Sequence, residues 1–165
     1  MNIPFPKRKP NRIPNFDYSS NGAYFVTLCT HEKQNTLCAS VGDGFPVPKP
    51  YGITAASFVA EIPKRFPQVH VDHYVVMPNH IHLLLFIDPS SAPQSPAPAL
   101  GNVMGWYKYQ VTKQINLSCG TPGTKIFQRS YHDHVIRGDQ DYLKIWAYID
   151  TNPQRWTKDC FYSPD

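Results

Sequence analysis

The sequence predicts an α+β domain in which helices flank a central antiparallel sheet. Segments rich in β-branched and aromatic residues alternate with segments in which apolar residues recur at helical spacing. Their order is strand, helix, two strands, helix, strand, helix, without the regular strand–helix repeat of a parallel sheet. The 165 residues, 41% of them hydrophobic, suffice for one domain with its own core and argue against a disordered chain.

The first strand and the first helix come from the first half of the chain. Residues 23–30 (AYFVTLCT) are β-branched and aromatic and predict a strand, whereas the turn formers of residues 40–50 predict a loop. Apolar residues recur at helical spacing over residues 54–66, and Pro63 inside this pattern predicts a kink or a break.

Two strands are predicted next, at residues 70–76 and 80–87, with Met-Pro-Asn at 77–79 between them. The simplest arrangement is an antiparallel hairpin, although a continuous bulged strand has the same pattern. Residues 88–98 are rich in proline and serine and predict a linker to the second half of the chain.

The second half predicts a helix, a strand region and a last helix. An apolar stripe over residues 99–116 indicates the first helix, and the bulky, branched residues 125–137 predict one or two strands. Asp139 or Asp141 is a suitable cap for the last helix, which we expect to end near Pro153.

A basic arm precedes the domain. We place the arm at residues 1–20 and a single domain at residues 21–165. The arm contains four cations before Asp17, its first acid, and the whole chain has a net charge of +4. Such an arm is either a phosphate contact or a solvated tail, and its charge alone does not decide between them. The four cations are Lys7, Arg8, Lys9 and Arg12.

The four cysteines form no Cys-x-x-Cys pair, so a zinc knuckle is not indicated and we expect free thiols. No apolar run reaches the length of a membrane span, and the first residues lack the apolar core of a signal peptide. We therefore expect a soluble intracellular protein. The cysteines are Cys29, Cys38, Cys119 and Cys160.

Two histidines, His80 and His82, begin the strand predicted at residues 80–87. Alternate residues of a strand face the same side, so both imidazoles project together. Such a pair is suited to a divalent metal, although ordinary polar residues at a sheet edge have the same spacing. His132 and His134 form a second pair, and spacing alone does not say which pair binds a metal.

A second group of candidate residues lies in the last helix. Tyr148 and Asn152 are four residues apart and share a helix face. Tyrosine is a nucleophile in some enzymes, and the amide oxygen of asparagine is a neutral metal ligand. From spacing alone, a core tyrosine and a terminal helix asparagine before a proline are favoured.

The chain resembles the HUH single-tyrosine transposases, and most closely their REP-associated branch. The resemblance rests on His80-Ile81-His82 preceded by Met-Pro-Asn, on NRIPNFDYSSNGAYFVTLCT near the start, and on KIFQRSYHDHVIRGDQDYLKIWAYIDTNPQRW near the end. It covers most of the chain except residues 34–50 and 88–98. It implies the ferredoxin-like fold of HUH nucleases, with a central antiparallel sheet flanked by helices.

The resemblance also assigns residue roles. It implies that His80 and His82 bind the metal, Mg²⁺ or Mn²⁺, and that Tyr148 is the nucleophile. Asn152 is implied as the third ligand, at a position where the insertion-sequence relatives commonly have Gln. The neighbouring Tyr131 and Tyr142 lack a polar partner four residues later.

The activity that the resemblance implies is transposition or DNA recombination through single-stranded cleavage. Relatives bind a DNA hairpin, such as a REP element, and cut the adjacent single strand. The tyrosine forms a 5′-phosphotyrosine intermediate and releases a 3′-OH, so that the strand is rejoined without ATP. The resemblance implies a cytoplasmic, nucleoid-associated protein of a prokaryote, acting either as a monomer or as a homodimer.

Further residues are candidates for DNA contacts. Aromatic and basic residues mix on the helix at 99–116, and two arginines are expected near the histidines. A surface cation is often simply solvated, so each of these is a hypothesis. The candidates are Trp106, Lys108, Lys113, Arg129 and Arg137, together with the cations of the arm.

Two other functions stay open at this point. One is a DNA-hairpin-binding protein that has the fold without the catalytic activity. The other is a metal-dependent hydrolase that uses water as the nucleophile, with Asp88 or Asp133 as its acid or base.

Overall fold

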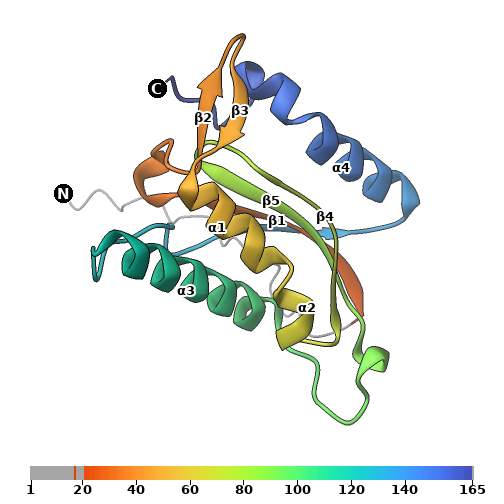
Figure 1. Ribbon diagram of the computed structural model, residues 1–165. Helices are drawn as coiled ribbons and strands as arrows, with labels where there is room; N and C mark the ends of the chain where they lie inside the picture. Colours follow the sequence, from red (N-terminus) through yellow and green to blue (C-terminus); the bar gives the residue numbers. More distant parts are fainter. Residues whose placement is uncertain (1–16, 18–20, 165) are drawn as a thin grey trace, which may run out of the picture.

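The computed structural model describes residue 17 and residues 21–164 (Figure 1). The four cations of the basic arm lie outside these residues, as does the arm's boundary with the domain.

The central sheet has four antiparallel strands in the spatial order β4-β5-β1-β6. One helical connection leads from β1 to β4 and another from β5 to β6, while β4 and β5 form a hairpin. This is the βαββαβ arrangement of the ferredoxin-like fold, so the predicted fold class is confirmed. The strands are β1 (Gly22–Cys29), β4 (Val69–Val76), β5 (His80–Ile87) and β6 (His132–Ile136).

Helices cover both faces of this sheet. In Figure 1, α1 and α3 lie on one face and α4 lies on the other. The Tyr107 hydroxyl donates a hydrogen bond of 2.8 Å to the Ala55 carbonyl and joins α3 to α1. The helices are α1 (Pro50–Val59), α2 (Ile62–Arg65), α3 (Leu100–Cys119) and α4 (Asp139–Thr151), with short 3₁₀ helices η1 (His31–Lys33), η2 (Pro89–Ser91) and η3 (Pro153–Lys158).

The residues of β5 divide between the two faces with the period of a strand. Ile81, Leu83, Leu85 and Ile87 belong to the main core together with the buried face of α3. The alternate residues lie on the opposite face, where His82 and Phe86 contact Tyr148 and Tyr142 of α4. The strand is therefore covered on both sides, which explains why its sequence is almost continuously apolar.

The prediction of a loop at residues 40–50 is wrong. Strands β2 (Cys38–Val41) and β3 (Phe45–Pro48) pair there as a separate two-stranded sheet. The turn formers occupy only Gly42, Asp43 and Gly44, and both glycines have positive φ. The strand was not predicted because β3 contains two prolines, which are rare inside sheets. They are tolerated here because both strands of a two-stranded sheet are edge strands.

The break predicted in the first helix is confirmed. α1 ends at Val59 and α2 begins at Ile62, so that Pro63 falls in the first turn of a new helix. Proline fits this position because its missing N–H would have no partner there.

The four cysteines are free thiols, as expected. Within the described part of the chain, no helix combines the length and the apolar character that a membrane crossing needs.

Substitution of Gly52 is expected to destabilise the fold strongly. A Cβ at Gly52 in α1 would lie 2.2 Å from the Leu37 carbonyl oxygen. That oxygen accepts a hydrogen bond of 2.8 Å from the Lys49 N–H, so it cannot easily move away. We expect Gly52→Ala to lower the free energy of unfolding by about 2 kcal/mol or more in urea denaturation.

The matched control is Gly105→Ala in α3, where an added Cβ meets nothing within 4 Å. This change is expected to raise the free energy of unfolding by roughly 0.5–1 kcal/mol, because alanine is the better helix former. Equal effects of the two substitutions would contradict the close approach of α1 to Leu37.

Candidate metal centre and nucleophile

His80 and His82 lie side by side at the start of β5, on the face that α4 covers. Their ring centroids are 4.5 Å apart. Both side chains are buried, with 0% and 1% of their surfaces exposed. A strand places them together because residues i and i+2 share a face.

Asn79 orients the ring of His80. The Asn79 side chain donates its amide hydrogens to the carbonyls of Phe161, at 2.8 Å, and Lys33, at 3.3 Å. Its oxygen therefore faces the His80 Nδ1 at 2.9 Å and accepts a hydrogen bond from it. The proton of neutral His80 is thus held on Nδ1, and the lone pair is left on Nε2.

The Nε2 atoms of both histidines are buried and have no hydrogen-bond partner among the described residues. His82 Nδ1 lies 2.8 Å from the Thr27 hydroxyl, which can hold a proton on that nitrogen in the same way. An unpaired buried polar atom is costly unless it has a ligand. Two such nitrogens side by side fit a divalent metal, with Asn79 and Thr27 as the outer groups that fix the rings.

Helix α4 brings Tyr148 and Asn152 to the same place. The centroids of the Tyr148 and His82 rings lie 5.2 Å apart, and the Tyr148 ring packs edge-on against the Phe25 ring. Tyr148 is 36% exposed, whereas Asn152 is 2% exposed. The Asn152 side-chain oxygen is buried without a hydrogen-bond partner in the part of the chain that the structure describes, so it is available as an oxygen ligand.

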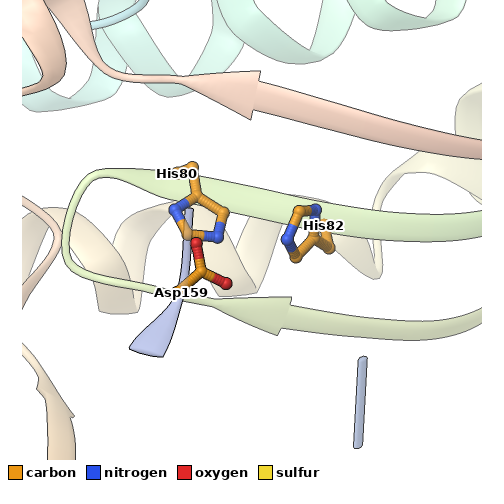
Figure 2. A group of neighbouring side chains, drawn as sticks. All are labelled: His80, His82 and Asp159. Carbon is orange, nitrogen blue, oxygen red and sulfur yellow. The ribbon is translucent and has the colours of Figure 1, made fainter. Parts of the chain in front are cut away.

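Asp159 completes the cluster, although no sequence motif had indicated it. One carboxylate oxygen accepts hydrogen bonds from the Asn152 amide at 2.7 Å and from the Tyr148 hydroxyl at 3.1 Å. Ligand atoms of Asp159, His80 and His82 all lie within 4.8 Å of one another. Figure 2 shows the carboxylate lying against the His80 ring, with His82 further along the strand. These donors fit a divalent metal held by nitrogen and oxygen.

Burial determines the protonation of this cluster. It lowers the pKa of His80 to about 4, against a smaller opposing effect of the Asp159 carboxylate. Burial also lowers the pKa of His82, and the neighbouring His80 adds to this shift. The pKa of Tyr148 is raised, first by burial and then by the charge of Asp159. At neutral pH the two imidazoles are therefore neutral and the tyrosine carries its proton.

A β-bulge in β4 attaches α4 to the sheet. The register shifts between Val71 and His73, so that Asp72 and His73 both contact α4. The Tyr142 hydroxyl donates to Asp72, and the His73 ring stacks on Trp146 with centroids 4.5 Å apart. Ile149 is the only fully buried residue between Asp139 and Thr151, so apolar burial alone anchors α4 weakly. The contacts with Asp72 and His73 therefore help to hold the helix that carries Tyr148.

Comparisons with known proteins find a sequence relative and solved structures of similar fold. No protein-family model matches the chain. An uncharacterized protein of Haemophilus influenzae is 30% identical in an alignment of 173 positions that covers 94% of this chain and 93% of the relative. The chain belongs to the same family as this Haemophilus protein.

Solved structures identify the fold. A REP-associated tyrosine transposase bound to a REP hairpin matches with a TM-score of 0.57 and 18% identity, over 90% of this chain and 74% of the other. A candidate transposase of Deinococcus radiodurans matches with a TM-score of 0.51 and 14% identity, over 85% and 95%. The fold is that of the tyrosine transposases.

In this transposase fold, geometry distinguishes the two histidine pairs that spacing left equivalent. His132 and His134 lie exposed on β6, and His134 is paired with Asp141 at 2.8 Å. Of these two pairs, only His80 and His82 combine burial with unpaired Nε2 atoms. The pair on β5 is therefore the better metal site.

The candidate DNA contacts lie in different environments. Trp106 packs edge-on against Phe66. The half-buried Lys108 donates to the carbonyls of Gln128 and Arg129 at 2.7 and 2.8 Å, and burial lowers its pKa. Lys113 is exposed on α3.

The two arginines lie at opposite ends of β1. Arg129 follows Gln128, whose N–H bonds the carbonyl of Cys29, the residue paired with His80. Arg137 follows Ile136, which pairs with Ala23 at the other end of the strand. Six residues of strand separate these points by about 20 Å, so the expectation that Arg137 lies near the histidines is wrong.

Proposed function

We propose that the protein is a metal-dependent single-stranded DNA endonuclease and strand transferase that acts beside DNA hairpins. The observation that carries this proposal is that Asp159 lies close to the two unpaired imidazole nitrogens and accepts hydrogen bonds from both the Tyr148 hydroxyl and the Asn152 amide, whose oxygen is also unpaired. A hydrolase that uses water has no need of a tyrosine in that position. The REP hairpin bound by the structural neighbour supports hairpin DNA as the partner.

The metal would be held by Nε2 of His80 and of His82 and by side-chain oxygens of Asn152 and Asp159. Two imidazoles in this set suit Mn²⁺ somewhat better than Mg²⁺, which prefers oxygen. When bound, the metal would polarise a non-bridging oxygen of the scissile phosphate. All four side chains come from one chain, so a single copy supplies the complete set.

Tyr148 would attack the phosphorus of the bound strand. A bond forms between the tyrosine oxygen and phosphorus while the bond from phosphorus to the 3′ oxygen breaks. The products are a 5′-phosphotyrosine and a 3′ oxygen that takes up a proton. The Asp159 carboxylate, 3.1 Å from the Tyr148 hydroxyl, is placed to accept the proton that the tyrosine loses.

The same geometry allows the strand to be rejoined. One phosphodiester replaces another, so little bond energy is lost in the first step. A 3′-OH that enters the position of the departed one can attack the phosphotyrosine and release Tyr148. Cutting and joining therefore need no ATP, which suits transposition or the processing of repeats in a bacterial nucleoid.

The experiment that tests this proposal is a denaturing-gel assay for a covalent protein–DNA adduct. The substrates are REP-like hairpins, each with an adjacent single strand, in Mn²⁺. An adduct is expected with these substrates and not with the same sequence as a full duplex. Hairpin binding without cleavage would favour the non-catalytic binding protein, and cleavage without an adduct would favour the water-using hydrolase.

Removal of the oxygen ligands is expected to weaken metal binding. Asp159→Asn removes the only negative charge among the proposed ligands, and Asn152→Ala removes the buried oxygen. We expect each change to weaken Mn²⁺ binding roughly tenfold or more in isothermal titration. The control Asp150→Asn, an exposed carboxylate of α4, should leave the affinity unchanged. Unaltered affinity in Asp159→Asn would restrict Asp159 to its hydrogen bond with Tyr148.

A further inference from the structure

A long stretch of the chain contains no acidic residue. Of the 12 acids in the sequence, none falls between Asp88 and Asp133, whereas the chain has Lys108, Lys113, Lys125 and Arg129 in this interval. The interval includes all of α3 and the segment that returns from α3 to β6. The charged residues of this interval are therefore all positive, which favours contact with a polyanion.

A groove of about 640 Å³ lies within this stretch, between α3 and residues 123–129. Tyr109 projects into it from α3 and is 61% exposed, although most large aromatic side chains avoid water. Lys125 and Arg129 line the opposite wall. Among the described residues, neither of these cations forms a salt bridge.

The far wall of the groove is held in place by hydrogen bonds to α3. The Lys108 ammonium donates to the carbonyls of Gln128 and Arg129, and the Asn116 amide donates to the Thr124 carbonyl at 3.0 Å. The Lys108 ammonium is therefore occupied by hydrogen bonds within the protein. The same bonds fix the backbone from which Lys125 and Arg129 project. The groove is thus a formed feature of the fold.

The groove lies on the α3 face and the metal centre on the α4 face, and both lie at the same end of β1. Phe127 bridges to Thr30, and the Gln128 N–H donates to the Cys29 carbonyl at 2.9 Å. Cys29 in turn pairs with His80. Two strand spacings, about 10 Å, therefore separate the backbone of the groove wall from that of the metal ligand. A strand that leaves the groove therefore reaches the metal centre by passing around this end of the sheet.

We infer that this groove binds unpaired nucleotides of the DNA strand next to the scissile phosphate. A base stacks on the Tyr109 ring, and Lys125 and Arg129 contact the phosphates on either side of it. Exposed aromatic rings beside cations bind single strands in this way, with little dependence on base identity. The inference rests on the proposed function for the position of the cut, and it adds the contacts that hold the strand.

Binding of a fluorescent 12-nucleotide oligothymidylate, followed by anisotropy in EDTA, tests the groove without any cleavage. Tyr109→Ala is expected to weaken binding on the order of fivefold or more, and Tyr109→Phe, which keeps the ring, is expected to bind like wild type. The matched control Tyr74→Ala removes another exposed tyrosine, on the far edge strand β4, and should bind like wild type.

The two cations are tested by the salt dependence of the same binding. The double variant Lys125→Gln/Arg129→Gln is expected to reduce the slope of log affinity against log salt by about 1.4, since each contact on a single strand contributes roughly 0.7. Lys64→Gln/Lys144→Gln, which removes two exposed lysines outside the groove, should keep the wild-type slope.

The adduct assay, run on the same variants, separates this inference from the proposed function. If wild type forms the adduct and the groove variants bind and react normally, the groove inference fails while the proposed function stands. If no protein forms an adduct but binding still depends on Tyr109 and the two cations, the groove is a nucleotide site and the proposed chemistry fails. Failure of wild type to bind the oligothymidylate at low salt would overturn the groove inference outright.

Discussion

Replacement of Tyr148 by phenylalanine is expected to abolish the covalent adduct with DNA while hairpin binding changes by no more than about twofold. The phenylalanine ring can still pack against His82 and Phe25, so the site keeps its shape. The variant lacks the oxygen that forms the bond to phosphorus. Its lost hydrogen bond to Asp159 is partly exposed and is expected to cost about 1 kcal/mol of stability.

The measurement compares adduct formation on denaturing gels with hairpin binding by anisotropy. Tyr142→Phe is the matched control, because it also removes a tyrosine hydroxyl of α4 that is bonded to a carboxylate, that of Asp72. This control should keep the adduct, at a reduced rate if α4 is less firmly attached. An adduct that survives in Tyr148→Phe and disappears in Tyr142→Phe would transfer the role of nucleophile to Tyr142.

Much of the fold could be predicted from local patterns. The β-branched and aromatic residues of β1 and the apolar stripe of α3 reflect the burial of these elements in the core. The hairpin of β2 and β3 was missed because its strands are short and contain prolines. Its stability comes from pairing and from contacts such as the Trp156 indole N–H with the Ser40 hydroxyl, at 3.2 Å.

Spacing could group the candidate site residues that are close in sequence. His80 and His82 share a strand face, and Tyr148 and Asn152 share a helix face, whereas their roles were implied by the family resemblance. The two pairs meet only because α4 packs on β4 and β5, which no local pattern reveals. The choice between the two histidine pairs likewise depended on burial, since both have the same spacing.

Residues that support the site from a distance were missed. Asn79 stood in the Met-Pro-Asn sequence, but its role depends on the carbonyls of Lys33 and Phe161, which are far apart in the chain. Asp159 follows η3 and belongs to no recognisable sequence motif. The turn of the folded chain brings it within hydrogen-bonding distance of Asn152. A carboxylate that is seven residues beyond a candidate ligand cannot be distinguished from a solvated one by sequence.

The free energy of unfolding is expected to fall steeply as the pH drops from about 6.5 to 4.5. In the folded protein, burial lowers the pKa of His80 to about 4 and the pKa of His82 well below its usual value of 6.5. The unfolded chain therefore binds these protons at a higher pH than the folded chain does. Stability is fully present above the unfolded pKa and is lost as the pH falls, by up to about 1.4 kcal/mol per pH unit for each histidine.

Urea denaturation in EDTA at several pH values between 7 and 4.5 measures this dependence. Acidic side chains titrate mostly below this window, so the histidines dominate it. His82→Gln is expected to have a shallower slope than wild type, because one buried imidazole has been removed. His70→Gln, which replaces an exposed histidine of β4, controls for the loss of a histidine elsewhere in the chain.

The acid sensitivity and the proposed metal site have the same physical origin. The fold keeps two imidazoles out of water and holds the proton of His80 on the nitrogen that faces Asn79. The remaining lone pairs are the ones that a metal requires, and they are also the ones that acid protonates. If His82→Gln kept the full wild-type slope, His82 would have to be solvated in the folded protein, and the buried ligand pair proposed for the metal would be contradicted as well.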